Sequence, residues 1–343
     1  MNIHSTLTTW IALTIILTGC DSNRSPYDYT ITELNYGSEP ENITFVPRAI
    51  NSAGRIVGIS VHATDLVSLV YEQNSMIELP ESSPQLFSGF DVNEQGTIAG
   101  YSWMTRHAFL YGEDGSTNLD DFLDTTEFPT SVAFGLNNHS DFVGAFWQAG
   151  HPSTAFVFEH QSLFSLDMCD SDLSRAEARD INDNGNIVGF CTDNAFENFK
   201  TFIRYQGEFK LLEIEGRGNL LGTEINDHDV IVGSYTSAEN EIHGFTYNLQ
   251  TEAFDDIGFI GTRPVMNINS QGVVIITGDV DKLVYSPGNG LKKLEELVDL
   301  SEWQSIREIN GINDKGQIVG YGTNALGQNR GFILNPTRVS YNN

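Results

Sequence analysis

Basic side chains are scarce in this sequence, which has 18 lysines and arginines against 46 aspartates and glutamates and a net charge of −28 at pH 7. Proteins that bind nucleic acids neutralise phosphates with clustered lysines and arginines, so nucleic acid is not an expected partner. The acidic residues are spread along the whole chain. That distribution favours a solvated acidic surface, and attraction of cations or of a basic partner is the alternative.

Linear catalytic motifs are also missing. The sequence contains no nucleophile elbow, no phosphate-binding glycine loop, no HExxH motif and no CxxC pair. Enzymes that depend on those motifs are therefore excluded. Enzymes whose sites are assembled from single residues far apart in the sequence are not.

Long apolar segments are scarce as well, and the clearest one, Trp10–Leu17, is too short to span a bilayer. It ends in Leu17-Thr18-Gly19-Cys20, which resembles the lipobox of bacterial lipoproteins, in which the cysteine becomes the lipidated N-terminus. The resemblance implies a signal peptide over residues 1–19 and a lipidated tether over residues 20–27. It also implies attachment to a membrane of the bacterial cell envelope, on the periplasmic side or at the surface, with inner and outer membrane both open. The alternative is an ordinary secretory signal with an incidental cysteine.

Two cysteines remain beyond Cys20, namely Cys169 and Cys191. An exported location favours a disulfide between them, and closing a loop of this length stabilises a fold by about 3 kcal/mol. Two buried free thiols are the alternative, because a sequence carries no geometry.

A repeat with a spacing of 42 to 45 residues organises the rest of the chain. Each unit has an apolar residue and an Asn, usually a Gly three residues later, then an apolar pair and a Gly seven residues after the Asn. Asn, which bonds its own main chain, and Gly, which adopts positive φ, are typical of a hairpin turn. Ser140 and Asp229 replace the first Gly in two units and Ile276 replaces the second in another, so we expect looser or bulged hairpins there. The repeated asparagines are Asn51, Asn93, Asn137, Asn182, Asn226, Asn269 and Asn313.

Two more strands follow each hairpin, for example Ala155–Phe158 and Leu163–Leu166. Four short strands that repeat at about 40 to 50 residues are typical of a propeller blade. A strand at Tyr29–Leu34 stands ahead of the first unit and would complete the last blade, which protects the sheet edges. We therefore predict an all-β, seven-bladed β-propeller with four-stranded blades, closed by an N-terminal strand. We expect it to be one domain over residues 28–343 and a monomer.

The unit resembles the bacterial "probable extracellular repeat, HAF family", through His107-Ala108-Phe109. The other units keep mainly the aromatic position, and Leu69 and Leu283 depart even there. The resemblance covers about residues 29–336. It implies an exported repeat protein and no particular activity or catalytic residue.

Ligands of propellers usually lie over the central channel, on the face formed by connections that enter the first strand and leave the second. We call this the upper face. In each unit an apolar residue stands directly before the repeated Asn. Side chains alternate along a strand, so the residue one position earlier points the opposite way, towards the channel. Arg48 and Arg179 would be counter-charges in a wet channel, which is the simpler interpretation. Four of the channel residues could instead supply oxygen ligands to a hard cation such as Ca²⁺: Asp91, Asp180, Glu224 and Asn267.

Aromatic and histidine side chains in the upper-face connections form a possible ligand face: Trp103, His107, Trp147, His151 and Trp303. Aromatics beside acids suit contact with a carbohydrate or a peptide, although packing between blades is the alternative for each Trp. We favour a non-catalytic, membrane-anchored propeller that presents a binding face to a protein, peptide or glycan. The second hypothesis is a glycan-cleaving hydrolase or lyase that uses acids and a His over the channel.

Overall fold

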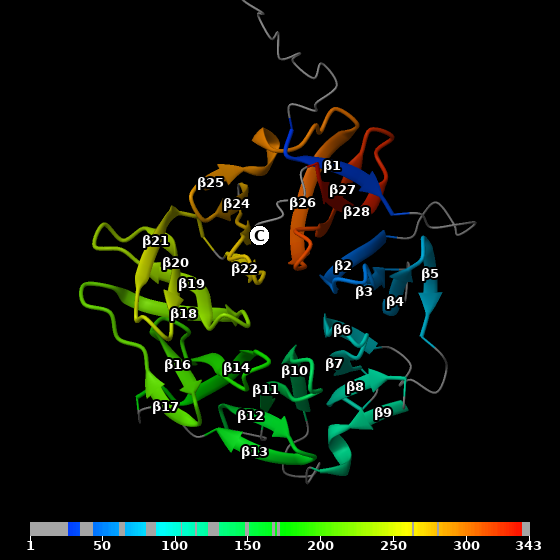
Figure 1. Ribbon diagram of the computed structural model, residues 1–343. Coiled ribbons are helices and arrows are strands. Elements are labelled where there is room, and N and C mark those ends of the chain that lie inside the picture. Colours follow the sequence, from blue (N-terminus) through cyan, green and yellow to red (C-terminus); the bar gives the residue numbers. More distant parts are fainter. Residues whose placement is uncertain are drawn as a thin grey trace, which may run out of the picture.

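The computed structural model describes residues 27–34, 44–61, 66–79, 87–103, 105–113, 115–122, 130–147, 151–166, 169, 172–262, 264–279 and 281–337. Within these ranges, seven four-stranded antiparallel sheets stand as blades around a common centre (Figure 1). The chain is therefore a seven-bladed β-propeller, which confirms the prediction from the repeat. The described part of the chain contains no helix that is long and apolar enough to cross a membrane.

The blades follow the chain in order, and each begins with its innermost strand. Blade 1 consists of β2 (Thr44–Ile50), β3 (Ile56–Val61), β4 (Leu66–Glu72) and β5 (Ser75–Glu78). Blade 2 consists of β6 (Phe87–Val92), β7 (Ile98–Ser102), β8 (Ala108–Gly112) and β9 (Gly115–Asn118), followed by the 3-10 turn η1 (Leu119–Asp121). Blade 3 consists of β10 (Thr130–Leu136), β11 (Phe142–Trp147), β12 (Ser153–Glu159) and β13 (Ser162–Leu166). Blade 4 consists of β14 (Arg175–Ile181), β15 (Ile187–Thr192), β16 (Phe199–Tyr205) and β17 (Glu208–Leu211). Blade 5 consists of β18 (Gly218–Ile225), β19 (Val230–Thr236), β20 (Ile242–Asn248) and β21 (Phe254–Phe259). Blade 6 consists of β22 (Val265–Ile268), β23 (Val274–Thr277), β24 (Lys282–Ser286) and β25 (Gly290–Lys293), followed by η2 (Leu294–Glu296). Blade 7 consists of β26 (Trp303–Ile312), β27 (Ile318–Asn324), β28 (Asn329–Pro336) and, as its outer strand, β1 (Tyr29–Glu33).

The N-terminal strand closes the ring, as the sequence predicts. β1 pairs antiparallel with β28, from Tyr29 opposite Pro336 to Glu33 opposite Phe332. The N–H of Thr337 adds a hydrogen bond of 2.8 Å to the carbonyl of Asp28. Blade 7 therefore contains both ends of the described chain in one sheet.

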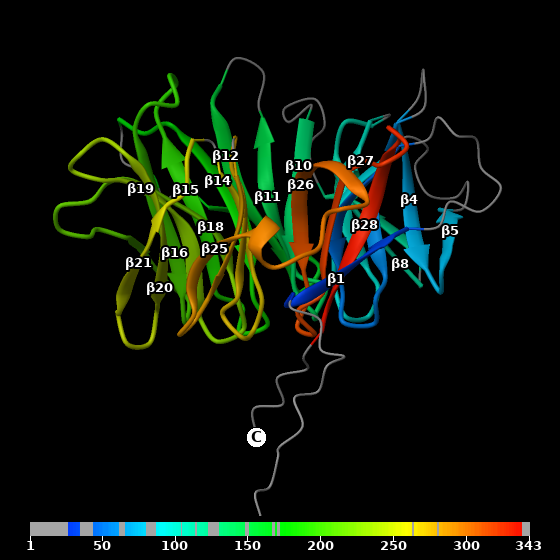
Figure 2. The same ribbon diagram turned by 90° about the horizontal axis from the view of Figure 1, so that it is seen from above.

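The seven hairpins between first and second strands all lie on one side of the disc, which we call the lower face (Figure 2). The ends of the described chain lie on that side too. Pro336 reaches the hairpin of blade 7, where its ring lies 3.3 Å from the position that a Cβ on Gly316 would take. The chain therefore enters and leaves the propeller beside the lower face.

In blades 3, 4 and 7 the second glycine of the unit makes room for a large ring from the third strand. Gly189 pairs with Phe202 across β15 and β16, and the Phe202 ring occupies the space that a Cβ at Gly189 would need. Blade 6 has neither this glycine nor the ring, since Ile276 pairs there with Leu283, whereas blade 1 keeps Gly58 opposite Leu69. The two departures in blade 6 compensate one another, and that blade stays regular.

The hairpins without the first glycine are as regular as the others, so the expectation of looser or bulged turns is wrong. Ser140 and Asp229 adopt the left-handed φ of 63° and 59° that Gly185 adopts at 72°. The N–H of Asp229 bonds the carbonyl of Asn226 at 3.0 Å, and the N–H of Gly185 makes the equivalent bond at 2.9 Å. Blade 6, with Ile276, pairs β22 with β23 without any shift of register. Local hydrogen bonds therefore hold the turn where glycine is absent.

The carboxylate of Asp229 shows how such a turn is stabilised. It accepts hydrogen bonds from Asn182, Asn184 and Asn186 of the preceding blade at 2.8–3.1 Å, and from Gln250 at 2.9 Å. Burial opposes ionisation of this carboxyl, but the four amide donors outweigh it and keep the pKa of Asp229 below its ordinary value. Asp229, whose φ is positive, is thus the centre of a hydrogen-bond network that joins blades 4 and 5.

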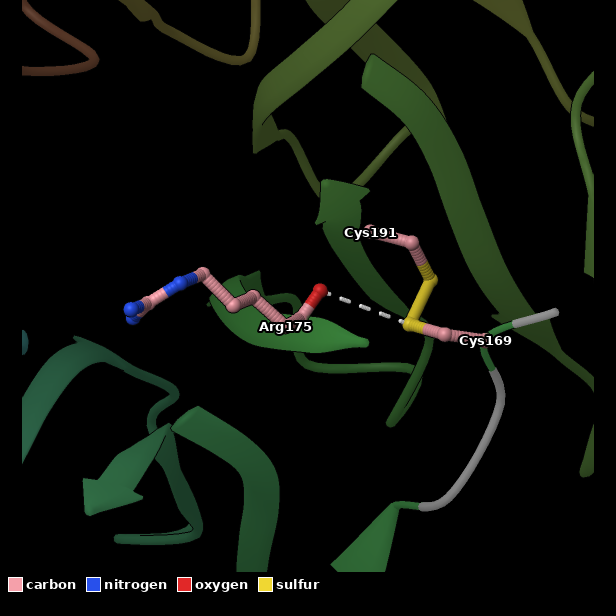
Figure 3. The surroundings of a disulfide bond; sticks show 3 residues. All are labelled: Cys169, Arg175 and Cys191. Carbon is pink, nitrogen blue, oxygen red and sulfur yellow. Dashed lines mark hydrogen bonds between the residues drawn. A yellow bond between two sulfur atoms is a disulfide. The ribbon is translucent and has the colours of Figure 1, made fainter. Parts of the chain in front are cut away.

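Cys169 and Cys191 form a disulfide with Cα atoms 5.6 Å apart (Figure 3). Cys191 lies buried on β15, and Cys169 lies in the connection that leads to β14. The Sγ of Cys169 also lies 3.6 Å from the carbonyl oxygen of Arg175. The bond therefore fastens an inter-blade connection to the second strand of blade 4. Cys20 lies outside the described residues.

Candidate functional site

A closed ring of hydrogen bonds surrounds the lower end of the channel. The Nδ2 of each repeated Asn donates to the main-chain oxygen of the repeated Asn in the next blade at 2.9–3.3 Å, and Asn313 returns to Asn51. Each Oδ1 accepts the N–H of the residue four positions later, at 2.8–3.0 Å. All seven asparagines are buried. One side chain therefore closes its own hairpin and joins its blade to the next.

The position after each repeated Asn forms a second ring at the lower mouth. In five steps around the ring, its main-chain N–H donates to the side chain of the same position in the next blade, at 2.7–2.9 Å. The acceptors are Glu94, Asn138, Asp183, Asp227 and Asp314. Burial raises the pKa of Asp227, and so do the charges of Asp183 and Asp314. The lower mouth is consequently acidic.

The predicted channel residues form a layer just inside this mouth. Asp91, Asp180 and Glu224, on β6, β14 and β18, line a cavity of about 190 Å³ together with Asn267 on β22. Burial and the charge of Asp180 raise the pKa of Asp91 to about 7. Burial raises the pKa of Asp180 to about 6, although two main-chain hydrogen bonds oppose that change. Burial and the charges of Asp180 and Asp91 raise the pKa of Glu224 well above its ordinary value.

Asp180 and Glu224 also affect each other's pKa, and the charge of Asp180 raises that of Glu224. Burial of neighbouring carboxyl groups favours a state in which one of them holds a proton. The inner layer therefore carries fewer negative charges at neutral pH than its three carboxyl groups suggest.

The two aspartates of this layer act as links between blades. Asp91 accepts the N–H of Val92 at 2.8 Å through Oδ1 and that of Leu136 in the next blade at 3.0 Å through Oδ2. Asp180 repeats the arrangement with Ile181 at 2.8 Å and Ile225 at 2.9 Å. Within the ranges that the structure describes, no three His, Cys, Asp or Glu side chains are arranged to hold a metal ion. The four predicted donors thus surround one cavity without forming a coordination sphere.

A register irregularity precedes this layer in the first strand of six blades. Regular alternation, as expected from the sequence, does not predict which residues this irregularity brings together. The guanidinium of Arg179 lies 4.2 Å from the ring centre of Phe134, and Phe90 lies 6.4 Å from the same ring. Arg179 also contacts Glu177 at 3.4 Å, and its charge opposes the rise in the pKa of Glu224. Arg179 is thus a counter-charge of the channel, as the simpler interpretation has it.

The five candidates for a ligand face occupy different environments. Trp103 is half exposed, donates from Nε1 to the Ser88 hydroxyl at 2.9 Å and stacks edge-on with Tyr101. His107 is buried, whereas His151 is exposed. Trp147 ends β11 and is partly buried.

Trp303 packs edge-on against Phe332 at 5.3 Å and lines a groove of about 690 Å³ at the rim of blade 7. The structure therefore does not unite the five in one site. Sequence reasoning had not picked out this groove, because its walls come from residues 27–33 and 299–326.

Comparison with known proteins shows the fold alone. No protein-family model matches the chain, and no curated protein resembles it in sequence. An oligogalacturonate lyase in complex with manganese has a TM-score of 0.62 and 9% identity, over 90% of this chain and 93% of that one. A catalytically inactive virginiamycin B lyase from Staphylococcus aureus with quinupristin has a TM-score of 0.56 and 11% identity, over 90% and 99%.

The β-propeller domain of the Trilobed protease from Pyrococcus furiosus, described as having an open velcro topology, has a TM-score of 0.53 and 10% identity, over 88% and 98%. Unlike that description, the ring of this chain is closed by β1. The solved structures similar to this chain are thus propellers with different activities.

Proposed function

We propose that this protein is a non-catalytic propeller, anchored in the bacterial cell envelope through Cys20, that presents its upper face to a protein, peptide or glycan. The observation that carries the proposal is the position of the chain ends beside the lower face. Cys20 precedes Tyr27 by seven residues, which reach at most about 25 Å when extended. A lipid on Cys20 would therefore hold the lower face towards the bilayer and leave the upper face free. The resemblance to extracellular HAF repeats supports this location.

The chemistry of the channel also supports a binding role. The asparagine ring and the two inner aspartates satisfy main-chain groups of neighbouring blades, a structural task. The cavity of about 190 Å³ is smaller than the roughly 300–1,000 Å³ of ordinary small-molecule sites. Its lining contains no His from the described residues.

A glycan-cleaving hydrolase or lyase is the second candidate, and one observation favours it. Asp180 and Glu224 line the same cavity and have raised pKa values, which is a common property of catalytic acids. This candidate requires that a sugar reach the two carboxyl groups through the lower mouth, where hairpin residues line the cavity. A hydrolase of this kind would lose turnover in Asp180→Asn and keep its ligand.

The test is binding of the full chain, in detergent, to an array of glycans and peptides, with and without Ca²⁺. We expect hits that weaken in Trp147→Ala and in His151→Ala and persist in Asp180→Asn. Binding that needs Ca²⁺ would assign Asp91, Asp180, Glu224 and Asn267 to a cation, and hits that depend only on Asp180 would contradict the upper-face proposal. A parallel variant, Cys20→Ser, should move from the membrane fraction to the soluble fraction.

A further inference from the structure

The groove at the rim of blade 7 combines aromatic walls with unopposed acids. Its volume is about 690 Å³, and it lies between β1 and the segments on either side of β26 and β27. Tyr27, Tyr29 and Trp303 supply rings, and Leu326 at the β27–β28 turn is 82% exposed. Leu326 is thus an aliphatic side chain that is largely open to water at the edge of an aromatic groove. Such a side chain is suited to contact with a ligand.

The charges in the groove all have one sign. Its lining contains Glu33, Asp299 and Glu302, and no Lys, Arg or His from the described chain. Arg330, just outside the lining, neutralises Glu33 at 3.2 Å. The N–H of Ser301 bonds Asp299 at 2.9 Å, and main-chain and side-chain hydrogen bonds from Ser301 lower the pKa of Asp299, so this carboxylate stays ionised. Two negative charges, on Asp299 and Glu302, therefore face the groove without a protein cation in its lining.

Charge and shape together point to one class of occupant. A lysine or arginine side chain has an apolar stem that can lie along Trp303 and Leu326, and a cationic head that suits tyrosine faces and carboxylates. A neutral glycan would use the rings but not the two charges, and an acidic peptide would be repelled. We propose that the rim groove binds a basic peptide segment of a partner protein. This inference rests on the proposed binding function and names the site and the partner class.

The location of the groove gives binding a structural consequence. One wall is β1, which pairs with β28 of blade 7. The N–H of Tyr29 also donates a hydrogen bond of 3.0 Å to the carbonyl of Leu297. The other wall contains Trp303 at the start of β26 and Leu326 after β27. A bound segment touches both walls and so favours the closed ring, which raises the temperature of unfolding as the concentration of free peptide increases.

The test measures binding of a fluorescein-labelled hexapeptide with two lysines and one leucine to the full chain in detergent, by anisotropy at two salt concentrations. We expect saturable binding that weakens at least tenfold in the Asp299→Asn, Glu302→Gln double variant and weakens with added salt. Leu326→Ser tests the apolar contact without disturbing a buried group. Glu252→Gln, at a carboxylate 73% exposed on blade 5, is the matched control and should bind as the wild type does. The melting temperature should rise with the peptide in the wild type and not in the double variant.

Several results would overturn the inference. Equal affinity of the double variant, or of a peptide in which norleucine replaces lysine, would remove the role of charge. Binding of neutral oligosaccharides at the groove in place of the peptide would assign the site to a glycan. The tether over residues 20–27 contains one basic side chain, Arg24, and binding only after Arg24→Gln would assign the groove to the tether of this chain. A different result would contradict the proposed binding function itself, namely chemical conversion of an array ligand by the protein. That result does not depend on whether the rim groove binds the hexapeptide.

Discussion

Glu224 gives a prediction about stability that depends on pH. Glu224→Gln keeps the shape of the side chain but cannot ionise. Burial raises the pKa of Glu224 in the folded protein, so the folded state holds this proton above the pH at which the unfolded chain, with a pKa near 4.3, releases it. Between those values the folded state binds more protons, and stability from this group falls as pH rises. The variant does not lose this stability. Its free energy of unfolding should therefore increase relative to that of the wild type as the pH rises.

The neighbouring carboxyl groups show how strongly a raised pKa in this layer can affect stability. Asp91 and Asp180 have pKa values of about 7 and about 6 against an ordinary 3.8. At about 1.4 kcal/mol per pH unit, these differences correspond to upper limits of about 4 and 3 kcal/mol. Both side chains line a cavity and are partly accessible, which reduces the effect by roughly half. Burial raises the pKa of Glu224 as well, so we expect Glu224→Gln to match the wild type near pH 4 and to exceed it increasingly as the pH rises to 8.

The assay is urea unfolding followed by tryptophan fluorescence at several pH values, with the difference between variant and wild type as the quantity compared. Glu252→Gln, at an exposed carboxylate, should show no trend with pH. A difference that stays constant from pH 4 to 8, or that favours the wild type at high pH, would refute the reasoning. A constant difference would mean that Glu224 has the same pKa in the folded and unfolded states, and an advantage of the wild type at high pH would mean that the channel stabilises its ionised form.

Four further predictions concern the frame and the anchor. Asn226→Ala removes one donor and one acceptor of the asparagine ring and should cost about 2–4 kcal/mol in urea unfolding, whereas Asn289→Ala in an exposed turn should cost less than 0.5 kcal/mol. Gly189→Ala places a methyl group against the Phe202 ring and should cost more than 3 kcal/mol or prevent folding, as judged by circular dichroism. Cys169→Ala should lower stability by about 3 kcal/mol and make the melting temperature insensitive to reductant. Cys20→Ser should abolish incorporation of labelled palmitate, and unchanged labelling would place the lipid elsewhere or exclude it.

The sequence predicts the architecture of this chain unusually well because the repeat carries it. A spacing of 42 to 45 residues, two turn residues and an aromatic position define a blade, and the unpaired strand at Tyr29 defines the closure. The pairing of Gly189 with Phe202 was visible only as two separate repeated positions. Blade 6 changes both positions, to Ile276 and Leu283, but blade 1 keeps Gly58 with Leu69, so the sequence does not reveal that the two positions are coupled.

The functional details were less accessible for physical reasons. The repeated Asn was interpreted as a turn residue, and its bond to the next blade depends on the distance between blades, which no single repeat contains. All seven units have Asn at this position and none has Asp or Ser. A turn alone accepts all three residues, so this constancy was the signal of a further role for the Asn side chain. The groove beside Trp303 joins segments about 270 residues apart, from residues 27–33 to residues 299–326, and only ring closure brings them together.

The most direct test of the central claim follows a bound array ligand over time. The full chain is incubated with the ligand that it binds best, and the ligand is recovered and analysed by mass spectrometry, with Asp180→Asn in parallel. The account predicts that both proteins return the ligand with unchanged mass after many times the residence time of the complex. Product formed by the wild type and not by Asp180→Asn would contradict it and establish the channel carboxyl groups as catalytic.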